Sequence, residues 1–436
     1  MTGARWIEHV VWWQVYPLGA VGADTTGGDR RLVHRLGRLE AWLDYAVDLG
    51  ASGLALGPVF AAGTHGYDTI DHFRVDPRLG DEADLVRLFE AAHGRGLRVM
   101  LDGVFNHVGR EFPAFARVLA DGPGAPEARW FRLGWPAGAT AGTVPAYGAF
   151  EGHRELVALN HDEPAVADYA TQVMCHWLER GADAWRLDAA YAVPPGFWAA
   201  VLPRVRRAYP DAWFVGEVIH GDYAAAVAAA GFDSVTQYEL WKAIWSSLND
   251  GNFFELAWAL GRHNGYLDTF APLTFVGNHD VTRLASRLTD DRHLPHALVV
   301  LLTTGGVPAI YYGDEQAFRG VKEDRAGGDD AVRPELPADP AGLAGYGWPT
   351  YRLHQQLIGL RRRHPWLHRA RVEPIELANT RLSYQASAGD ERLLVALNLD
   401  DAPADFALPG ATEVLAGAAT LADRVTVPAR GWAVLC

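Results

Sequence analysis

The 436-residue sequence predicts a (β/α)8 TIM barrel, in the α/β class, with a short subdomain inserted after strand 3 and a C-terminal antiparallel β-domain. Three observations predict this fold. Eight short apolar or β-branched runs alternate with amphipathic helical stretches, and eight parallel strands close such a barrel. A segment rich in Gly, Ala and Pro interrupts the alternation between His107 and Leu159. After about residue 368 the pattern changes to short alternating strands, which is typical of an antiparallel sheet.

The strand and helix patterns follow one another through most of the chain. The expected strands cover residues 10–17, 52–60, 98–105, 184–190, 213–219, 234–240, 272–278 and 307–313. The expected helices cover residues 34–49, 82–93, 163–180, 196–208, 222–230, 252–263, 293–303 and 351–363. Helix periodicity and glycines near several helix ends support these assignments. Alternation through eight units favours a closed barrel over an open sheet.

These patterns divide the chain into three parts. Residues 1–107 and 159–367 form the barrel, residues 108–158 the inserted subdomain, and residues 368–436 the C-terminal β-domain. Runs such as "RLLVALNL" and "RVTVPARGWAVL" carry the alternating pattern of the last part.

Composition excludes several classes of function. The chain has 39 Lys and Arg against 53 Asp and Glu, a net charge of −14, and no basic stretch with interleaved aromatic residues. We therefore expect no nucleic-acid partner. The longest apolar run is interrupted by glycines and a proline, so we expect no membrane span. The N-terminus lacks a signal-peptide pattern, and we expect a cytoplasmic protein.

Polar side chains stand where several predicted strands end. The run "FVGNHD" ends in His279 and Asp280, and similar placements give Asp102, His107 and Glu217. The loops after the strands build the active site at the C-terminal mouth of a parallel barrel. We therefore expect these residues to meet at the mouth, where His279 and Asp280 need not be buried.

Two of these strand ends predict a pair of carboxylates. Side chains two apart on a strand share a face, so Arg186 and Asp188 project together, and the guanidinium is expected to keep Asp188 ionised. Partial desolvation is expected to raise the pKa of Glu217 and keep it protonated. One ionised and one protonated carboxyl are the pair that a retaining glycosidase needs. Taken singly, each residue fits a helix cap or a structural ion pair equally well.

Four segments resemble hallmark regions of the α-amylase family, glycoside hydrolase family 13. They are "DGVFNH", "GADAWRLDAA", "GEVI" and "FVGNHD", in this order. The resemblance covers nearly the whole chain and includes "GYDTIDHFRVDPRLG" and "GVPAIYYGDE".

The resemblance implies a role for each matching residue. Asp188 would be the nucleophile, Glu217 the general acid/base and Asp280 the stabiliser of the transition state. The residues implied to line the subsite of the attacked sugar are Tyr67, His107, Arg186 and His279. In several members, a pair at the spacing of Asp329 and Arg333 touches sugar on the non-reducing side; a surface ion pair is the alternative interpretation of these two residues.

The sequence departs from the family pattern at three positions. Many α-amylases carry Lys-His where this chain has Tyr191 and Ala192, and the exo-acting α-glucosidases tend to carry Asp where it has Thr64. We expect no cofactor or metal. Calcium would need six to eight oxygen ligands, and the short insert has few acids before Glu151.

The leading hypothesis is a retaining α-glycosidase that hydrolyses short malto-oligosaccharides or α-glucosides through a covalent glycosyl-enzyme intermediate. A transglycosylase or sugar isomerase with the same catalytic trio is the alternative, because water and an acceptor hydroxyl compete for one intermediate. A non-catalytic barrel is a third interpretation. Most of the 16 tryptophans are expected in the core, with Trp135 and Trp241 the first to examine as sugar contacts.

Overall fold

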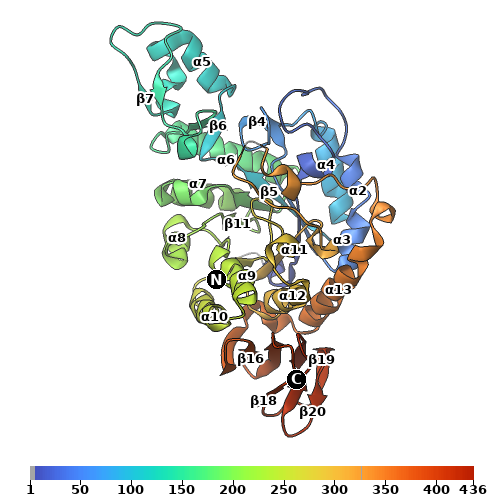
Figure 1. Ribbon diagram of the computed structural model, residues 1–436. Helices are drawn as coiled ribbons and strands as arrows, with labels where there is room; N and C mark the ends of the chain where they lie inside the picture. The colour runs from blue at the N-terminus through green and yellow to red at the C-terminus, as the bar shows by residue number, and fades with distance from the viewer. Residues whose placement is uncertain (1–4, 326) are drawn as a thin grey trace.

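A parallel eight-stranded barrel forms the centre of the computed structural model, which describes residues 5–325 and 327–436 (Figure 1). The first four residues of the predicted 1–107 segment lie outside the described residues. The barrel strands are β1 (Trp12–Val15), β2 (Gly53–Leu56), β5 (Arg98–Gly103), β10 (Ala184–Leu187), β11 (Trp213–Gly216), β12 (Ser234–Val235), β13 (Leu273–Thr274) and β14 (Val307–Tyr311). Each lies within a predicted strand, which confirms the predicted barrel.

The strands pair in chain order around the barrel. The order is β12-β11-β10-β5-β2-β1-β14-β13, and every pairing in it is parallel. A single parallel bridge between Thr236 and Leu273 joins the two end strands. The barrel is therefore nearly closed, with its weakest pairing between β12 and β13.

Alternate strand residues fill the barrel interior. Trp12, Met100, Trp213 and Phe275 are buried in one apolar cluster, and the rings of Trp12 and Trp213 stack at 6.1 Å between centroids. The intervening residues face outward, where Trp13 and Trp185 join the larger core formed with the surrounding helices. This two-sided burial explains why the strands appear as nearly continuous apolar runs.

The outer layer consists of helices of very different lengths. They are α1 (Pro17–Ala20), α2 (Gly37–Glu40), α3 (Leu43–Leu49), α4 (Glu82–His93), α6 (Pro164–Glu179), α7 (Pro195–Ala208), α8 (Tyr223–Ala230), α9 (Tyr238–Asp250), α10 (Phe254–Tyr266), α11 (Leu284–Arg287), α12 (Leu294–Thr303) and α13 (Trp348–Arg363). The predicted helix 34–49 is wrong as one helix, because two short helices, α2 and α3, occupy its range.

The predicted strand 234–240 is wrong beyond Val235, because helix α9 begins at Tyr238. The side chain of Gln237 accepts a hydrogen bond from the backbone N–H of Leu240 at 3.2 Å, which caps the helix. Leu240, Ala243 and Ser247 are then buried at helical spacing. The apolar residues after Val235 therefore belong to a helix face and not to a strand.

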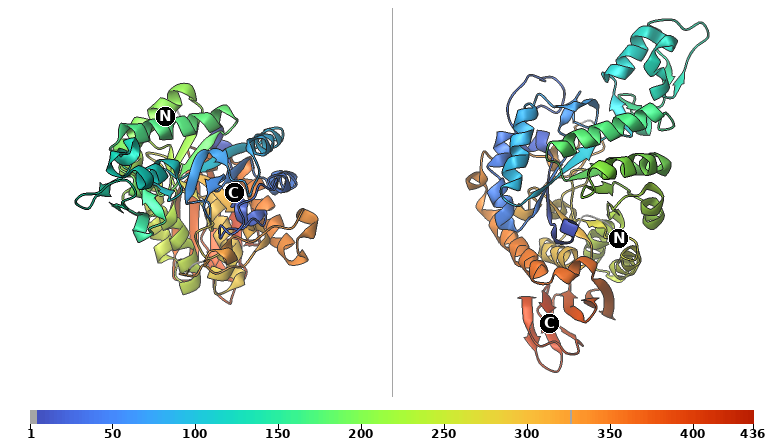
Figure 2. Two further views of the ribbon diagram at one scale, coloured as in Figure 1. Left: turned by 90° about the horizontal axis from the view of Figure 1, so that it is seen from above. Right: turned by 180° about the vertical axis from the view of Figure 1, so that it is seen from behind.

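The inserted segment projects away from the barrel, as Figures 1 and 2 show. Strand β6 (His107–Gly109) pairs with β9 (Leu156–Ala158), so the segment leaves and rejoins the barrel side by side. Between them lie α5 (Pro113–Asp121), β7 (Leu133–Gly134) and β8 (Ala146–Tyr147). The ring of Phe115 contacts Phe131 and Tyr147 and forms a small apolar centre.

The C-terminal part is an antiparallel β-domain, as predicted. One sheet has the order β15-β16-β17-β22-β19 and a second has β18-β21-β20. Their bounds are β15 (Arg371–Leu377), β16 (Arg381–Ala388), β17 (Glu391–Asn398), β18 (Ala404–Phe406), β19 (Val414–Gly417), β20 (Thr420–Leu421), β21 (Val425–Val427) and β22 (Trp432–Leu435). Asn264 of α10 exchanges two hydrogen bonds with the backbone of Val372, which fastens the domain to the barrel.

Within residues 5–325 and 327–436, no helix is both long enough and apolar enough to cross a bilayer.

Candidate active site

Arg186 lies at the centre of the polar groups that follow the barrel strands. Its Nη1 is 3.2 Å from Asp188 Oδ1 and its Nη2 is 2.7 Å from Glu217 Oε1. Nη1 also contacts both oxygens of Asp102, at 2.6 and 2.7 Å, and Nη2 lies 3.9 Å from Asp280 Oδ2. One guanidinium therefore brings together carboxylates from the ends of β5, β10 and β11 and from the loop after β13, and the predicted common face of Arg186 and Asp188 is confirmed.

The backbone after Asp188 is strained in a way that serves the site. Ala189 has a positive φ of 45°, a conformation that L-residues rarely adopt. This turn directs its N–H toward Glu217, whose Oε2 accepts the hydrogen bond at 2.9 Å. Tyr238 donates its hydroxyl to Glu217 Oε1 at 3.2 Å. Glu217 is therefore fixed by three donors, one of which, Tyr238, was missed because the sequence placed it in a strand.

The carboxyl groups of Asp188 and Glu217 influence one another. Burial raises the pKa of Asp188, and the negative charge of Glu217 adds to this, while Arg186 acts in the opposite direction. The prediction that Arg186 keeps Asp188 ionised is therefore wrong, because burial outweighs the guanidinium. The negative charge of Glu217 thus disfavours a second negative charge on Asp188.

Asp280 is held in its ionised form. Burial would raise its pKa, but the interactions with His279, Arg333 and Arg186 overcome this and the pKa is lowered. His279 Nε2 lies 2.9 Å from one carboxylate oxygen and Arg333 Nη2 2.9 Å from the other. The side chain of Asp280 is 29% exposed, as expected at the mouth.

His279 is buried, contrary to the sequence-based expectation. Its side chain is only 1% exposed. The ring lies 5.5 Å from that of Tyr67 and nearly parallel to it, at 3°, and its Nε2 contacts the Tyr67 hydroxyl. Gln14 Nε2 lies 3.2 Å from its Nδ1. The polar ring can be buried because both of its nitrogens have hydrogen-bond partners.

His107 and Tyr67 complete the wall opposite the carboxylates. His107 Nε2 lies 3.1 Å from the backbone oxygen of Tyr67, and the Tyr67 hydroxyl donates to Asp102 at 3.1 Å. Burial lowers the pKa of His107 to about 3, so its imidazole is neutral at pH 7. Phe150 of the insert stacks on this ring at 4.7 Å. A neutral imidazole has one N–H, which is donated here to the Tyr67 oxygen, so the ring forms part of the wall without adding charge.

Arg333 belongs to the same group, although the sequence left its role open. Its side chain is 9% exposed, and its Nε donates to the backbone oxygen of His279 at 3.0 Å. Asp329 contacts Arg333 Nη2 at 3.0 Å and also lies 3.3 Å from Lys322. Arg333 therefore connects Asp329 to Asp280. A purely superficial ion pair does not describe this arrangement.

Tyr191 stands at the position where many family members carry lysine. Its hydroxyl donates to Glu151 Oε1 of the insert at 2.8 Å, and its ring lies 5.8 Å from that of His220. Glu151 has a positive φ of 48°. The insert thus reaches across to the loop after β10, a contact that the sequence did not predict because the two residues are 40 positions apart.

The residues around Asn106 do not fit a calcium site. The side-chain nitrogen of Asn106 lies 3.1 Å from His107 Nδ1. Four acids of the insert already contact other side chains: Glu111 with Arg30, Glu127 with Arg117, Glu151 with Tyr191 and Glu155 with Arg110. Calcium needs six to eight oxygens around one point. Among the described residues, the one cluster with metal-ligand spacing is His34, Asp81 and Asp84, and the two aspartates form the capping box of α4.

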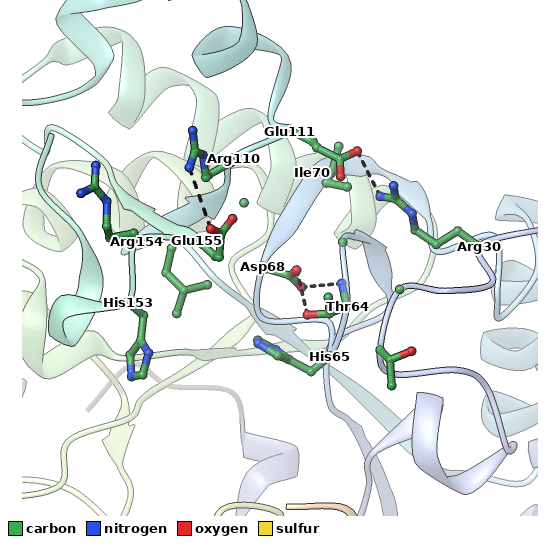
Figure 3. A pocket seen from close by; sticks show the side chains of 15 residues that line it. Arg30, Thr64, His65, Asp68, Ile70, Arg110, Glu111, His153, Arg154 and Glu155 are labelled. Atoms are coloured by element: carbon green, nitrogen blue, oxygen red, sulfur yellow. Dashed lines mark hydrogen bonds and ion pairs between the residues drawn. The ribbon is translucent and has the colours of Figure 1, made fainter. Parts of the chain in front are cut away.

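A cavity of about 510 Å³ adjoins the Tyr67 side of the site (Figure 3). Thr64, His65 and Asp68 line it from the barrel, and Arg110 and His153 line it from the insert. The sequence turns from β3 (Phe60–Ala62) into β4 (Thr69–Val75) here, and Asp68 accepts two hydrogen bonds from Thr64, which fixes the turn. The backbone N–H of Tyr67 donates to His65 Nδ1 at 3.2 Å. His65 of the cavity wall therefore also holds Tyr67 of the candidate active site in place.

This fold and this set of carboxylates define a class of glycoside hydrolases. The family model described as "Alpha amylase, catalytic domain" matches residues 35–345. The chain therefore belongs to the α-amylase family, glycoside hydrolase family 13, and is a glycoside hydrolase of the α-glucan-hydrolysing kind.

Relatives of known name support the same class. A cyclomaltodextrinase of Geobacillus thermopakistaniensis is 30% identical over 432 residues, which cover 93% of this chain and 71% of that protein. Neopullulanase 2 of Thermoactinomyces vulgaris is 30% identical over 85% of this chain and 66% of its own.

Solved structures share the fold over their full length. The debranching enzyme of Nostoc punctiforme superposes with a TM-score of 0.84 at 27% identity and 99% coverage of both chains. A cyclic α-maltosyl-(1→6)-maltose hydrolase of Arthrobacter globiformis, solved with its cyclic substrate, has a TM-score of 0.84 at 25% identity and full coverage of both chains.

Proposed function

We propose that the protein is a retaining α-glycosidase that hydrolyses α-glucosidic bonds of short malto-oligosaccharides, linear or cyclic. The observation that carries this proposal is the shared guanidinium of Arg186, whose two terminal nitrogens contact Asp188 and Glu217. Carboxyls bound to two nitrogens of one guanidinium must lie close together. A short separation, about 5 to 5.5 Å, is typical of retaining glycosidases, whereas inverting enzymes leave room for a water.

In the first step, ionised Asp188 attacks the anomeric carbon while protonated Glu217 gives its proton to the leaving oxygen. The glycosidic C–O bond breaks, and an ester bond forms between the sugar and Asp188. In the second step, Glu217 takes a proton from water, whose oxygen attacks the same carbon and releases Asp188. The charge of Glu217 is one cause of the raised pKa of Asp188, and a proton on Glu217 would remove this cause, so the two roles are compatible.

Asp280, held ionised by His279 and Arg333, would balance the positive charge that develops on the sugar ring. Tyr67 would stack on the sugar, and His107 and His279 would line the subsite around its ring. Asp329 and Arg333 would contact sugar on the non-reducing side, where Arg333 also supports Asp280.

The substrate proposal rests on the leaving-group side and on the relatives. Tyr191, whose hydroxyl donates to Glu151, offers a ring on this side in place of a charged lysine, which favours short substrates. Relatives named cyclomaltodextrinase, maltogenic α-amylase and neopullulanase agree with α-glucan oligosaccharides. A cytoplasmic location is part of the proposal, supported by a Bacillus subtilis relative, 29% identical, that is named intracellular maltogenic amylase.

The test is a substrate panel with product analysis. The purified enzyme is incubated with maltotriose, a cyclodextrin, panose and soluble starch, and the first anomer released is read by proton NMR. We expect α-anomers first and higher kcat/KM on oligosaccharides than on starch chain ends. Release of β-anomers first would contradict retention, and a rapid fall in starch viscosity would contradict the preference for short substrates. Products larger than or isomeric to the substrate would indicate a transglycosylase or isomerase instead.

A further inference from the structure

A groove of about 480 Å³ lies over helices α9 and α10, beside the site described above. The loop after β11 forms one side of it with Ile219 and His220, and Tyr238 and Trp241 line it from α9. Figure 1 shows α9 and α10 beside one another on the flank of the barrel. None of the residues assigned to the catalytic trio lines this groove.

An exposed indole forms part of the groove from α10. Trp258 is 60% exposed and is the one exposed tryptophan among the residues the structure describes. The guanidinium of Arg262 lies 5.0 Å from the centroid of its ring, which holds the indole in place from one side. An exposed aromatic ring with one supported face offers its other face to a ligand, and the apolar face of a sugar ring suits such a surface.

Two ion pairs line the groove with hydrogen-bonding groups. Arg262 Nε donates to Glu239 Oε1 at 2.6 Å. Lys242 contacts Glu255, which also accepts a hydrogen bond from a serine hydroxyl of α9. The pairs are accessible and carry no net charge, so they can bind neutral hydroxyls without favouring an anion. The combination of an aromatic surface and balanced polar groups fits a neutral oligosaccharide.

Two residues that line the groove also contact residues of the proposed active site. Tyr238, which lines the groove, donates its hydroxyl to Glu217, the proposed general acid. His220, which also lines the groove, has its ring 5.8 Å from that of Tyr191. A chain that passes Tyr191 after the cleaved bond would therefore meet His220 and then the groove.

We propose that this groove is an accessory binding site for the reducing-side glucosyl units of a longer α-glucan, with Trp258 as its stacking surface. The proposal rests on the proposed function, because it takes the leaving-group side from that mechanism. It assigns a role to an exposed tryptophan that the catalytic site does not use, and it predicts a chain-length preference that depends on α10.

The test compares long and short substrates in matched variants. The ratio of kcat/KM for maltoheptaose to that for maltotriose is measured in the wild type, Trp258→Ala, Trp258→Tyr and Phe254→Ala. Phe254 is 51% exposed on the same helix and does not line the groove, so it serves as the control. We expect the ratio to fall about fivefold to tenfold in Trp258→Ala, to recover in part in Trp258→Tyr and to stay at the wild-type value in Phe254→Ala.

A binding measurement separates the two proposals. Maltoheptaose is titrated calorimetrically into Asp188→Asn and into Asp188→Asn/Trp258→Ala, where no turnover is needed. Weaker binding in the double variant supports the groove even if the wild type hydrolyses none of the oligosaccharides, a result that would overturn only the proposed function. Equal binding in both proteins, or an unchanged ratio in Trp258→Ala, would overturn the groove.

Discussion

Arg186 shows how one residue organises the site. Its guanidinium contacts Asp102, Asp188 and Glu217 and lies within 3.9 Å of Asp280, so four carboxylates face a single buried cation. With more negative than positive charge in this buried space, the carboxylates compete for ionisation. Asp280 also contacts His279 and Arg333 and stays ionised, while the pKa of Asp188 is raised.

At the residue scale, Asp188→Asn is expected to lower kcat by at least roughly a thousandfold, as when other enzymes lose their nucleophile. An amide cannot form the ester with the sugar. The activity is measured with maltotriose, and near-UV circular dichroism confirms that the fold is intact. Azide added to Asp188→Ala should restore turnover by attacking the same carbon. A fully active Asp188→Asn would remove Asp188 from the nucleophile's role.

Arg333→Lys is expected to lower kcat/KM by about 10- to 100-fold, the equivalent of about 1.5 to 3 kcal/mol for a hydrogen bond to a charged group. Arg333 donates to both Asp280 and the backbone of His279, and a single ammonium group cannot reproduce this fork. Arg319→Lys is the control, because Arg319 forms an exposed ion pair with Asp291. Equal losses in the two variants would show that the position of Arg333 near Asp280 is unimportant.

At the scale of elements, the site is built by loops that strands position. The turn after β10 directs the N–H of Ala189 to Glu217, and the start of α9 presents Tyr238 to the same carboxyl. The insert adds Phe150 on His107 and Glu151 on Tyr191. The barrel therefore supplies the carboxylates of the site, while the insert supplies side chains that pack beside them.

Two variants of Tyr191 can separate the effect of its ring from the effect of its hydrogen bond. Tyr191→Phe removes only the bond to Glu151, whereas Tyr191→Ala removes the ring as well. If the ring binds the leaving sugar, kcat/KM for maltotriose should stay close to the wild-type value in Tyr191→Phe. It should fall about fivefold to tenfold in Tyr191→Ala. Equal losses in both variants would assign the effect to the contact with Glu151.

At the scale of the whole molecule, the buried charges affect stability. The C-terminal sheet, the helices and the outward strand residues share one apolar core, so the site is set in a rigid frame. Such a frame can hold like charges together that would separate in a flexible chain. With Asp188 as the proposed nucleophile, activity and stability oppose one another at this residue, because its carboxylate is also costly to bury.

Thermal unfolding can detect this opposition. The folded-state pKa of Asp188 is raised, so its protonated form is favoured and stability is lost as pH rises through that pKa. Asp188→Asn should therefore raise Tm at pH 7, by about 1 to 2 °C, and the gain should shrink toward the unfolded pKa near 4.

Asp280→Asn is the matched variant with the opposite sign. The pKa of Asp280 is lowered, so its ionised form stabilises the fold above the unfolded pKa and this contribution disappears as pH falls. Tm at pH 7 should drop in this variant. Calorimetric scans from pH 4 to pH 8 measure both effects. A shift in the same direction for both variants at pH 7 would contradict the assigned electrostatics.

The sequence by itself determined the barrel, the C-terminal β-domain and the chemical groups at the strand ends. Apolar runs of strand length and helix periodicity are local properties, and a carboxylate directly after an apolar run stands out without any tertiary contact. The prediction failed where a local pattern fits two structures. The apolar residues after Val235 suit a strand, but Gln237 caps a helix there.

Only the tertiary structure decided the properties that depend on neighbours distant in sequence. Arg333 meets Asp280 across 53 positions, and His279 is buried because Gln14, 265 positions away, and Tyr67 satisfy its nitrogens. The raised pKa of Asp188 follows from burial and from Glu217 on the next strand, and the exposure of Trp258 follows from its place on the outer face of α10. Burial and Coulomb interactions depend on distances in space, which a one-dimensional pattern does not contain.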